Sequence, residues 1–357
     1  MNEKKRTSYF VTGGAGFIGS NFINYILNKY KQNVTIVNYD LLTYAGNLSN
    51  LAAAENYPNY KFIKGDIADS VAVNEALKKY EIDYIINFAA ESHVDRSIID
   101  STPFIRTNIM GTQVLLDSAL KYGVKTFLQV STDEVYGSLS AKGYFTETSP
   151  LAPSSPYSAS KTSADLLALA AFKTHKLPVI ITRCSNNYGP YQFPEKLIPL
   201  MIANVINKKP LPVYGKGENI RDWLYVSDHC QAIDMALKNG RHGEIYNIGG
   251  NNELKNIDAI NLIIDTLEKK GYHGGRKLIT FVADRPGHDL RYAIDSSKIR
   301  SELGFAPSLN FDEGIKKTID WYIENTVWWQ NIISGEYSAY YEKLYKPKFN
   351  IKTDAKS

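Results

Sequence analysis

The chain has 357 residues, of which 44% are hydrophobic and 22% are charged, and its 41 Lys and Arg exceed its 37 Asp and Glu by four. This is the composition of an ordinary globular protein and excludes a mainly disordered chain. The small net charge and the absence of a basic run interleaved with aromatics argue against a nucleic-acid partner. No apolar run near the start is long enough for a signal peptide or membrane span, so we expect a cytoplasmic protein.

Apolar runs rich in β-branched and aromatic residues alternate with helix-like stretches through the first half of the chain. Strands are predicted at residues 9–12, 34–39, 60–64, 84–88, 126–131 and 179–183. Helices are predicted at residues 17–30, 69–80, 103–122 and 156–175. This alternation is typical of crossover units that build a parallel sheet covered by helices on both faces.

The second half of the chain is less regular. Proline and glycine become frequent after Asn187, while residues 244–248 again resemble a strand and residues 252–270 a helix. We therefore predict an α/β fold: a Rossmann-like, doubly wound parallel sheet with a smaller, interleaved C-terminal domain. From Lys346 onward the sequence is polar and unpatterned, so we expect residues 346–357 to be a frayed tail.

A glycine-rich turn follows the first predicted strand directly. Its glycines are Gly13, Gly14, Gly16 and Gly19, and a helical pattern begins at once. Such a turn brings bare backbone and a helix N-terminus to a pyrophosphate. Asp40 ends the second strand 21 residues after Gly19, where a carboxylate accepts hydrogen bonds from ribose hydroxyls and repels a 2′-phosphate. The motif therefore indicates NAD rather than NADP.

Two later strand ends extend this predicted cofactor site. Asp66 follows the third strand, where it could contact an adenine edge, although alone it would more often be a helix N-cap. The fourth strand runs into small residues at Ala89 and Ala90, which would let a cofactor cross the carboxyl edge of the sheet.

Tyr157 and Lys161 are four residues apart in a predicted helix and so share one face. An ammonium near a phenol favours the phenolate and lowers its pKa, which makes the tyrosine a candidate base. Such a pair is usually a solvated helix surface. Here it accompanies the dinucleotide motif and Ser131 and Thr132 at a strand end, which favours a catalytic role.

These features resemble the extended short-chain dehydrogenase/reductase family. Longer stretches are similar to the dTDP-glucose 4,6-dehydratases within it, over residues 8 to 345. They include residues 39–48, 89–97, 131–137, 183–190, 221–226 and 284–289. The acidic pair Asp133 and Glu134 distinguishes this group, because related sugar-nucleotide epimerases carry small or neutral residues there.

The resemblance implies a reaction in which NAD transiently oxidises carbon 4 of the glucosyl unit, with Tyr157 as base. Glu134 would then remove the proton on carbon 5 while a protonated Asp133 assists loss of the hydroxyl from carbon 6. The hydride would return to carbon 6, giving dTDP-4-keto-6-deoxyglucose. Enzymes of this kind serve deoxysugar biosynthesis, for example of rhamnose.

The resemblance also implies the residues of the site. The catalytic residues would be Thr132, Asp133, Glu134, Tyr157 and Lys161. NAD would contact Gly13, Gly16, Phe17, Ile18, Gly19, Asp40, Leu41, Leu42, Thr43, Asp66, Ile67, Ala89, Ala90, Glu91, Ser92, His93, Thr107, Tyr157, Lys161 and Asn187. The nucleotide sugar would contact Ser92, Thr132, Asn186, Glu195, Lys196, Leu197, Pro212, Val213, Tyr214, Arg221, Asn252, Asp284, Arg285, Pro286, Gly287 and His288.

The predicted domains follow from the same resemblance. An NAD-binding domain would span residues 1–188, with returning segments around 224–250, and a substrate-binding domain residues 189–345. We expect a homodimer through the helices at 103–122 and 156–175. No metal site is expected, and Cys184 and Cys230 are interpreted as packing residues in a reducing compartment.

Three functional hypotheses stay open at this point. The first is the dTDP-glucose dehydratase, which Asp133 and Glu134 favour. The second is a dehydratase acting on UDP- or CDP-glucose, or a 4-epimerase, either of which shares the oxidation step. The third is a non-catalytic NAD-binding regulator, which the presence of Thr132, Tyr157 and Lys161 disfavours.

Overall fold

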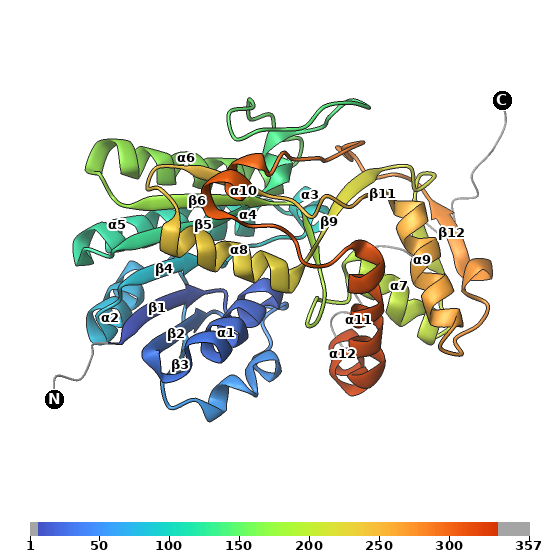
Figure 1. The fold of residues 1–357 in the computed structure, drawn as a ribbon, viewed down its shortest axis with the longest axis horizontal. Helices are drawn as coiled ribbons and strands as arrows, with labels where there is room; N and C mark the ends of the chain where they lie inside the picture. Colours follow the sequence, from blue (N-terminus) through green and yellow to red (C-terminus); the bar gives the residue numbers. More distant parts are fainter. Residues whose placement is uncertain (1–5, 335–357) are drawn as a thin grey trace.

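The computed structural model describes residues 6–334, and the predicted tail at 346–357 lies outside this range. A seven-stranded sheet in the order β10-β6-β5-β4-β1-β2-β3 forms the larger part of the molecule (Figure 1). All of its neighbouring strands pair in parallel. Its strands are β1 (Thr7–Thr12), β2 (Val34–Asp40), β3 (Tyr60–Lys64), β4 (Tyr84–Asn87), β5 (Thr126–Thr132), β6 (Val179–Cys184) and β10 (Ile245–Ile248). The predicted doubly wound α/β fold is confirmed.

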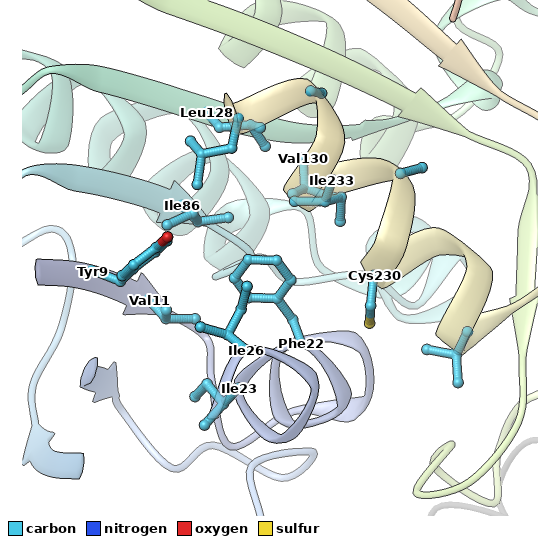
Figure 2. Close-up of a cluster of buried hydrophobic side chains, with 14 of the residues drawn as sticks. Tyr9, Val11, Phe22, Ile23, Ile26, Ile86, Leu128, Val130, Cys230 and Ile233 are labelled. Atoms are coloured by element: carbon cyan, nitrogen blue, oxygen red, sulfur yellow. The ribbon is translucent and has the colours of Figure 1, made fainter. Parts of the chain in front are cut away.

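Helices cover both faces of this sheet because its strands are apolar on both sides. One layer contains α1 (Phe17–Tyr30), α8 (Val226–Asn239) and α10 (Ser297–Leu303). The other contains α2 (Ser70–Tyr80), α5 (Thr112–Tyr122) and α6 (Pro156–His175). Figure 2 shows the core under the first layer, where Phe22 of α1 and Ile233 of α8 meet Val11 and Leu128 of the sheet.

A second, smaller part follows β6 and has its own hydrophobic core. Its first sheet consists of β7 (Asn186–Tyr188), β9 (Ile220–Tyr225) and β11 (Glu253–Lys255), and its second of β8 (Leu211–Tyr214) and β12 (Ile279–Val282). The helices packed on them are α7 (Leu197–Ile206), α9 (Asn256–Glu268), α11 (Phe311–Glu324) and α12 (Thr326–Ile333). Strand β10 lies beyond β9 in sequence but at the edge of the large sheet, so the two parts are interleaved.

Short helices complete the described chain. They are α3 (Val94–Ile99), α4 (Thr102–Phe104), the π-helical segment η4 (Ile105–Gly111), and the 3₁₀ helices η1 (Lys31–Asn33), η2 (Leu48–Leu51), η3 (Ala54–Asn56), η5 (Asp133–Tyr136) and η6 (Gly275–Leu278). In residues 6–334 no helix is both long enough and apolar enough to cross a membrane.

Two predicted helices need correction. The helix predicted at 252–270 begins only at Asn256, because residues 253–255 pair with β9 as a strand. The helix predicted at 103–122 is α-helical at Thr102–Phe104 and Thr112–Tyr122 but π-helical from Ile105 to Gly111. Within that segment the amide of Asn108 donates to the Glu91 carbonyl and the Ser160 hydroxyl, which ties the segment to the end of β4 and to α6.

Candidate active site

A cavity of about 310 Å³ lies along the carboxyl edge of the large sheet. It is lined by the turn after β1 and by residues that end or directly follow five further strands, namely Asp40, residues 65–67, residues 88–92, residues 130–134 and residues 184–187. Ligands of open parallel sheets bind at this edge. The cavity is therefore the candidate active site.

The turn between β1 and α1 brings backbone to the cavity. Gly13 has φ +65°, and a Cβ there would lie 2.6 Å from the backbone nitrogen of Ala89. A Cβ on Gly19 would lie 2.3 Å from the carbonyl oxygen of Gly13. Gly16 differs, since a Cβ there would meet only that same oxygen, at 3.3 Å, while the residue lines the cavity. The turn thus keeps an open cradle in front of the N-terminus of α1, which suits a pyrophosphate.

Asp40 is held in place at the end of β2. Its Oδ2 accepts from the backbone N–H of Ala15 at 2.9 Å and its Oδ1 from that of Leu42 at 2.7 Å. Each carboxylate oxygen keeps acceptor capacity for a further donor. The glycine cradle and this oriented carboxylate fit a dinucleotide with a free 2′-hydroxyl.

Two acids of the candidate site lie on η5, the 3₁₀ turn that follows β5. Thr132 caps this turn, because its Oγ1 accepts from the backbone N–H of Glu134 at 3.2 Å and its hydroxyl contacts Asp133 Oδ1 at 3.3 Å. Oδ2 of Asp133 is buried and has no hydrogen-bond partner among the described residues. An unpartnered buried carboxyl oxygen in a cavity is available for a ligand.

The surroundings of Asp133 and Glu134 shift their pKa values to different extents. Burial raises the pKa of Asp133 well above its usual range, and the neighbouring charges of Glu134 and Asp222 raise it further. Burial also raises the pKa of Glu134, but the charges of Arg285, Arg221 and a lysine oppose the effect. The site thus favours the proton on Asp133 and the charge on Glu134.

Tyr157 and Lys161 come from the first turns of α6. Helix formation there is set by a capping box, in which the side chains of Ser155 and Ser158 bond each other's backbone N–H, with a proline following the N-cap. Both functional side chains are buried and line the cavity. The Lys161 ammonium donates to the carbonyl of Val130 at 2.7 Å.

The expected lowering of the Tyr157 pKa by Lys161 is wrong for this structure. Burial raises the pKa of Tyr157, and the negative charge of Glu134 raises it further. Burial lowers the pKa of Lys161, against the charge of Asp165. In both groups burial is the largest contribution, and it opposes the charged form.

Three cationic side chains from the second part of the molecule lower the pKa of Glu134. Lys196 lines the cavity and donates to the Ser92 carbonyl at 2.9 Å. Arg221 and Arg285 are largely buried, and their charges, like that of Lys196, lower the pKa of Glu134. A cluster of positive side chains beside the cavity suits a phosphorylated ligand.

The cavity brings together all five predicted catalytic residues and most of the predicted cofactor contacts. These are Thr132, Asp133, Glu134, Tyr157 and Lys161, with Gly13, Gly16, Phe17, Ile18, Gly19, Asp40, Leu41, Thr43, Asp66, Ile67, Ala89, Ala90, Glu91, Ser92, Thr107 and Asn187. Of the predicted substrate contacts it also contains Asn186, Glu195 and Lys196 besides Ser92 and Thr132.

Several predicted contacts lie outside the cavity lining. They are Leu42, His93, Leu197, Pro212, Val213, Tyr214, Arg221, Asn252, Asp284, Arg285, Pro286, Gly287 and His288. His93 instead lies 3.8 Å from the Glu195 carboxylate. Among the described residues, the side-chain amide of Asn252 donates to the carbonyls of Trp223 and Gly250 and accepts from the N–H of Phe311, so it stabilises the second part of the molecule.

The structure adds cavity residues that the sequence did not reveal. Tyr44 and Phe193 both line the cavity, with ring centroids 5.4 Å apart and edge to face. The Arg96 guanidinium lies 3.8 Å from the Tyr44 ring centroid and donates to Glu195 Oε2. Tyr44 follows Asp40 closely, so its position just after a strand end could have predicted that it lines the cavity. Phe193 and Arg96 have no such position, and only tertiary contacts bring them to Tyr44.

Residues 6–334 contain no group of three or more His, Cys, Asp or Glu side chains arranged to hold a metal ion. Cys184 and Cys230 are free and buried. Cys184 lines the cavity, and burial raises the pKa of its thiol to about 12.

Comparisons with known proteins agree with this geometry. The family model described as GDP-mannose 4,6 dehydratase matches residues 10–318. A probable dTDP-glucose 4,6-dehydratase of Sinorhizobium fredii is 54% identical, over 92% of this chain and 96% of the relative. The crystal structure of dTDP-glucose 4,6-dehydratase from Bacillus anthracis in complex with NAD matches with a TM-score of 0.85 and 50% identity, over 91% and 99% of the two chains. UDP-glucuronic acid 4-epimerase from Bacillus cereus has a TM-score of 0.81 at 29% identity, over 89% and 99%.

The fold and the site define the class of short-chain dehydrogenases/reductases. The features of this class are the doubly wound sheet, the glycine turn after β1, the oriented acid that ends β2 and the buried Tyr–Lys pair on α6. Two observations point to one group within this class: the two acids on η5, and the identity of about half of the aligned residues with the dTDP-glucose 4,6-dehydratases compared above. The chain belongs to the dTDP-glucose 4,6-dehydratase family, as the sequence resemblance predicted.

Proposed function

We propose that the chain converts dTDP-glucose into dTDP-4-keto-6-deoxyglucose with NAD as its cofactor. The observation that carries the proposal is the pair Asp133 and Glu134, which shares one cavity with Tyr157 and Lys161. A 4-epimerase needs only the oxidation of carbon 4 and the return of the hydride to the opposite face of the ketone. Loss of water across carbons 5 and 6 needs an acid and a base as well, and the different surroundings of the two carboxyls supply both.

The reaction starts at carbon 4, where Tyr157 takes the hydroxyl proton and Thr132 hydrogen-bonds the oxygen. When bound, NAD supplies a hydride acceptor for carbon 4 and, once reduced, the hydride that returns to carbon 6; its oxidised form also carries a positive charge. A positive charge close to Tyr157 would lower the pKa that burial and Glu134 raise. Lys161, four residues further along the same helix, would add a second positive charge near Tyr157 when it is protonated.

Elimination follows from the ketone at carbon 4, which acidifies the hydrogen on carbon 5. Glu134 removes that proton, and protonated Asp133 gives its own proton to the hydroxyl that leaves carbon 6 as water. Glu134 later returns its proton to carbon 5. The proton held by Tyr157 replaces the one lost from Asp133 before the next turnover, so the enzyme ends unchanged.

Binding is divided between the two parts of the molecule. Residues 1–188, with returning segments around 224–250, form the NAD-binding domain of this proposal, and residues 189–345 the substrate-binding domain. The glycine cradle and Asp40 hold the dinucleotide. Lys196, Arg221 and Arg285 would neutralise the substrate diphosphate, because cationic side chains of this kind pair with phosphate oxygens.

Incubation of the purified protein with dTDP-glucose, without added reductant, tests the proposal. Mass spectrometry should show a product lighter by one water molecule. Parallel incubations with UDP-glucose and CDP-glucose test the nucleotide preference. A galactosyl product of unchanged mass would identify a 4-epimerase instead, and no turnover of any substrate would favour the non-catalytic hypothesis.

A homodimer and a cytoplasmic location complete the proposal. Exposed apolar side chains gather on the neighbouring segments η4 and α6, where Ile105, Met110 and Leu166 are each half exposed. Such side chains are typical of an interface between helices. The free cysteines suit a reducing compartment, and fractionation of producing cells tests that location.

A further inference from the structure

A buried carboxylate that the proposed mechanism does not use joins the two parts of the molecule. Asp95 lies in the first turn of α3, and its side chain is 8% exposed. The hydroxyl of Tyr214 donates to its Oδ2 at 3.1 Å. Nη1 of Arg285 lies 3.6 Å from its Oδ1. Each carboxylate oxygen therefore contacts a different residue of the second part.

The two partners of Asp95 come from one small sheet. Tyr214 is the last residue of β8 and pairs with Val282, the last residue of the parallel strand β12, which Arg285 follows closely. Asp95 itself follows the carboxyl end of β4. The carboxylate thus bridges the carboxyl ends of strands from the large sheet and the two-stranded sheet.

Arg285 keeps donor capacity in this arrangement. Its Nε is buried and has no hydrogen-bond partner within residues 6–334. Its ion pair with Asp95 is longer than a hydrogen bond, and its charge reaches Glu134 in the cavity. The guanidinium is therefore held beside the reacting acids with N–H groups still available to an anion.

We infer that Asp95 is a positioning residue, which orients Arg285 and Tyr214 to receive the nucleoside diphosphate of the substrate. The inference rests on the proposed function and deepens it. Asp95 lies outside the cavity lining, so it acts on binding and not on the reacting carbons. By charge alone a carboxylate opposes the binding of a diphosphate. A loss of affinity when its charge is removed therefore indicates an effect through the side chains on which Asp95 acts, namely Arg285 and Tyr214 by contact and Lys196 by charge.

The variant Asp95→Asn, in the holoenzyme, tests this inference because it removes the charge at nearly constant volume. The KM for dTDP-glucose should rise about tenfold and kcat should change less than about threefold, as expected for lost binding interactions. Calorimetry with dTDP as the probe should show a similar loss of affinity. Tighter binding of dTDP, or a fall in kcat at unchanged KM, would overturn the inference.

Two further variants sharpen the test. Asp95→Glu keeps the charge but displaces the carboxylate by one methylene from Tyr214 and Arg285, so it should weaken dTDP binding, though less than Asp95→Asn. If Asp95→Asn does not fold, a loss of dTDP affinity in Asp95→Glu supports the inference and unchanged affinity overturns it. In a Tyr214→Phe background, Asp95→Asn should reduce the affinity for dTDP by a smaller factor than in the unaltered chain, because one of the two contacts of Asp95 is already absent. Additive effects of the two substitutions would contradict positioning through Tyr214.

Asp258→Asn is the matched control, since it removes an exposed carboxylate in the first turn of α9 and should change neither constant. The unaltered enzyme distinguishes failure of the positioning role from failure of the proposed function. If it dehydrates dTDP-glucose while Asp95→Asn binds dTDP equally well, only the positioning role fails. If the unaltered enzyme neither binds dTDP nor turns over dTDP-glucose, the proposed function fails as well.

Discussion

Neighbouring acids in one cavity can have opposite tasks when their surroundings differ. Asp133 is fully buried beside two other carboxylates, Glu134 and Asp222, so its proton is retained. Glu134 is partly buried, but the charges of Arg285 and Arg221 act on it. The backbone turn η5 thus places an acid and a base one residue apart, and the second part of the molecule makes them different.

Asp133→Asn should separate the two proton transfers of the elimination. Loss of the acid slows water release by on the order of 100-fold or more, the usual contribution of a positioned general acid. Glu134 still exchanges the hydrogen on carbon 5. In deuterated buffer, mass spectrometry should therefore show the sugar nucleotide gaining deuterium without losing water, whereas Glu134→Gln abolishes both changes.

The pH dependence of the unaltered enzyme follows from the same pKa directions. The raised pKa of Glu134 means that its base form is lost as pH falls through a value above the ordinary carboxyl range. The raised pKa of Asp133 means that its acid form persists to higher pH and is lost as pH rises through that value. The control variant is Glu75→Gln, at an exposed position on α2, which should change neither the rate of dehydration nor its pH dependence. An unchanged rate of dehydration in Asp133→Asn would contradict these roles.

Much of the candidate site was predictable at the scale of residues, because catalytic side chains follow strand ends or share a helix face. The spacing of Tyr157 and Lys161 and the position of Asp40 are examples. Their pKa values were not predictable, since burial is a property of the folded chain. The contact of Arg96 with Tyr44 joins segments with no common sequence pattern, so only the structure reveals it.

At the scale of elements, the β1–α1 turn uses its glycines for two different purposes. Gly19 permits close packing inside the turn, whereas Gly16 leaves space in the cavity. Gly16→Val should therefore remove bound NAD while changing the free energy of unfolding of the cofactor-free protein by less than about 1 kcal/mol. Nucleotide released on denaturation, together with urea unfolding, measures both quantities.

Gly19→Ala is the matched substitution, because its Cβ would lie 2.3 Å from a backbone oxygen that cannot easily move. We expect it to destabilise the cofactor-free protein by about 1–3 kcal/mol, as overpacking does. If Gly16→Val retained NAD, the cradle would not be the pyrophosphate site.

Elements with a long, regular pattern were predicted well, and short ones were not. Six apolar runs and four helical stretches correspond to β1–β6 and to α1, α2, α5 and α6. The helix predicted at 252–270 includes the three residues of strand β11. These residues form a strand because they pair with β9, which is distant in sequence and leaves no local signal. The π-helical turn η4 depends on tertiary contacts of Asn108 that no local periodicity encodes.

At the scale of the whole molecule, the proposed dimer predicts which surface is sensitive to charge. Leu166→Glu, on the half-exposed face of α6, should shift sedimentation toward the monomer and weaken association at least tenfold, since a charge is excluded from an apolar interface. Val327→Glu on α12, also exposed, should leave sedimentation unchanged. A monomeric unaltered chain, or a fully dimeric Leu166→Glu, would contradict the proposed interface.

The placement of β10 bears on how the chain is made. The backbone leaves the large sheet after β6, builds β7, β8 and β9, and only then returns through α8 to pair β10 with β6. During synthesis β6 therefore stays an open edge until the ribosome has passed Ile248. Unpaired edges invite aggregation, so a nascent chain stalled before β10 is the species most in need of a chaperone.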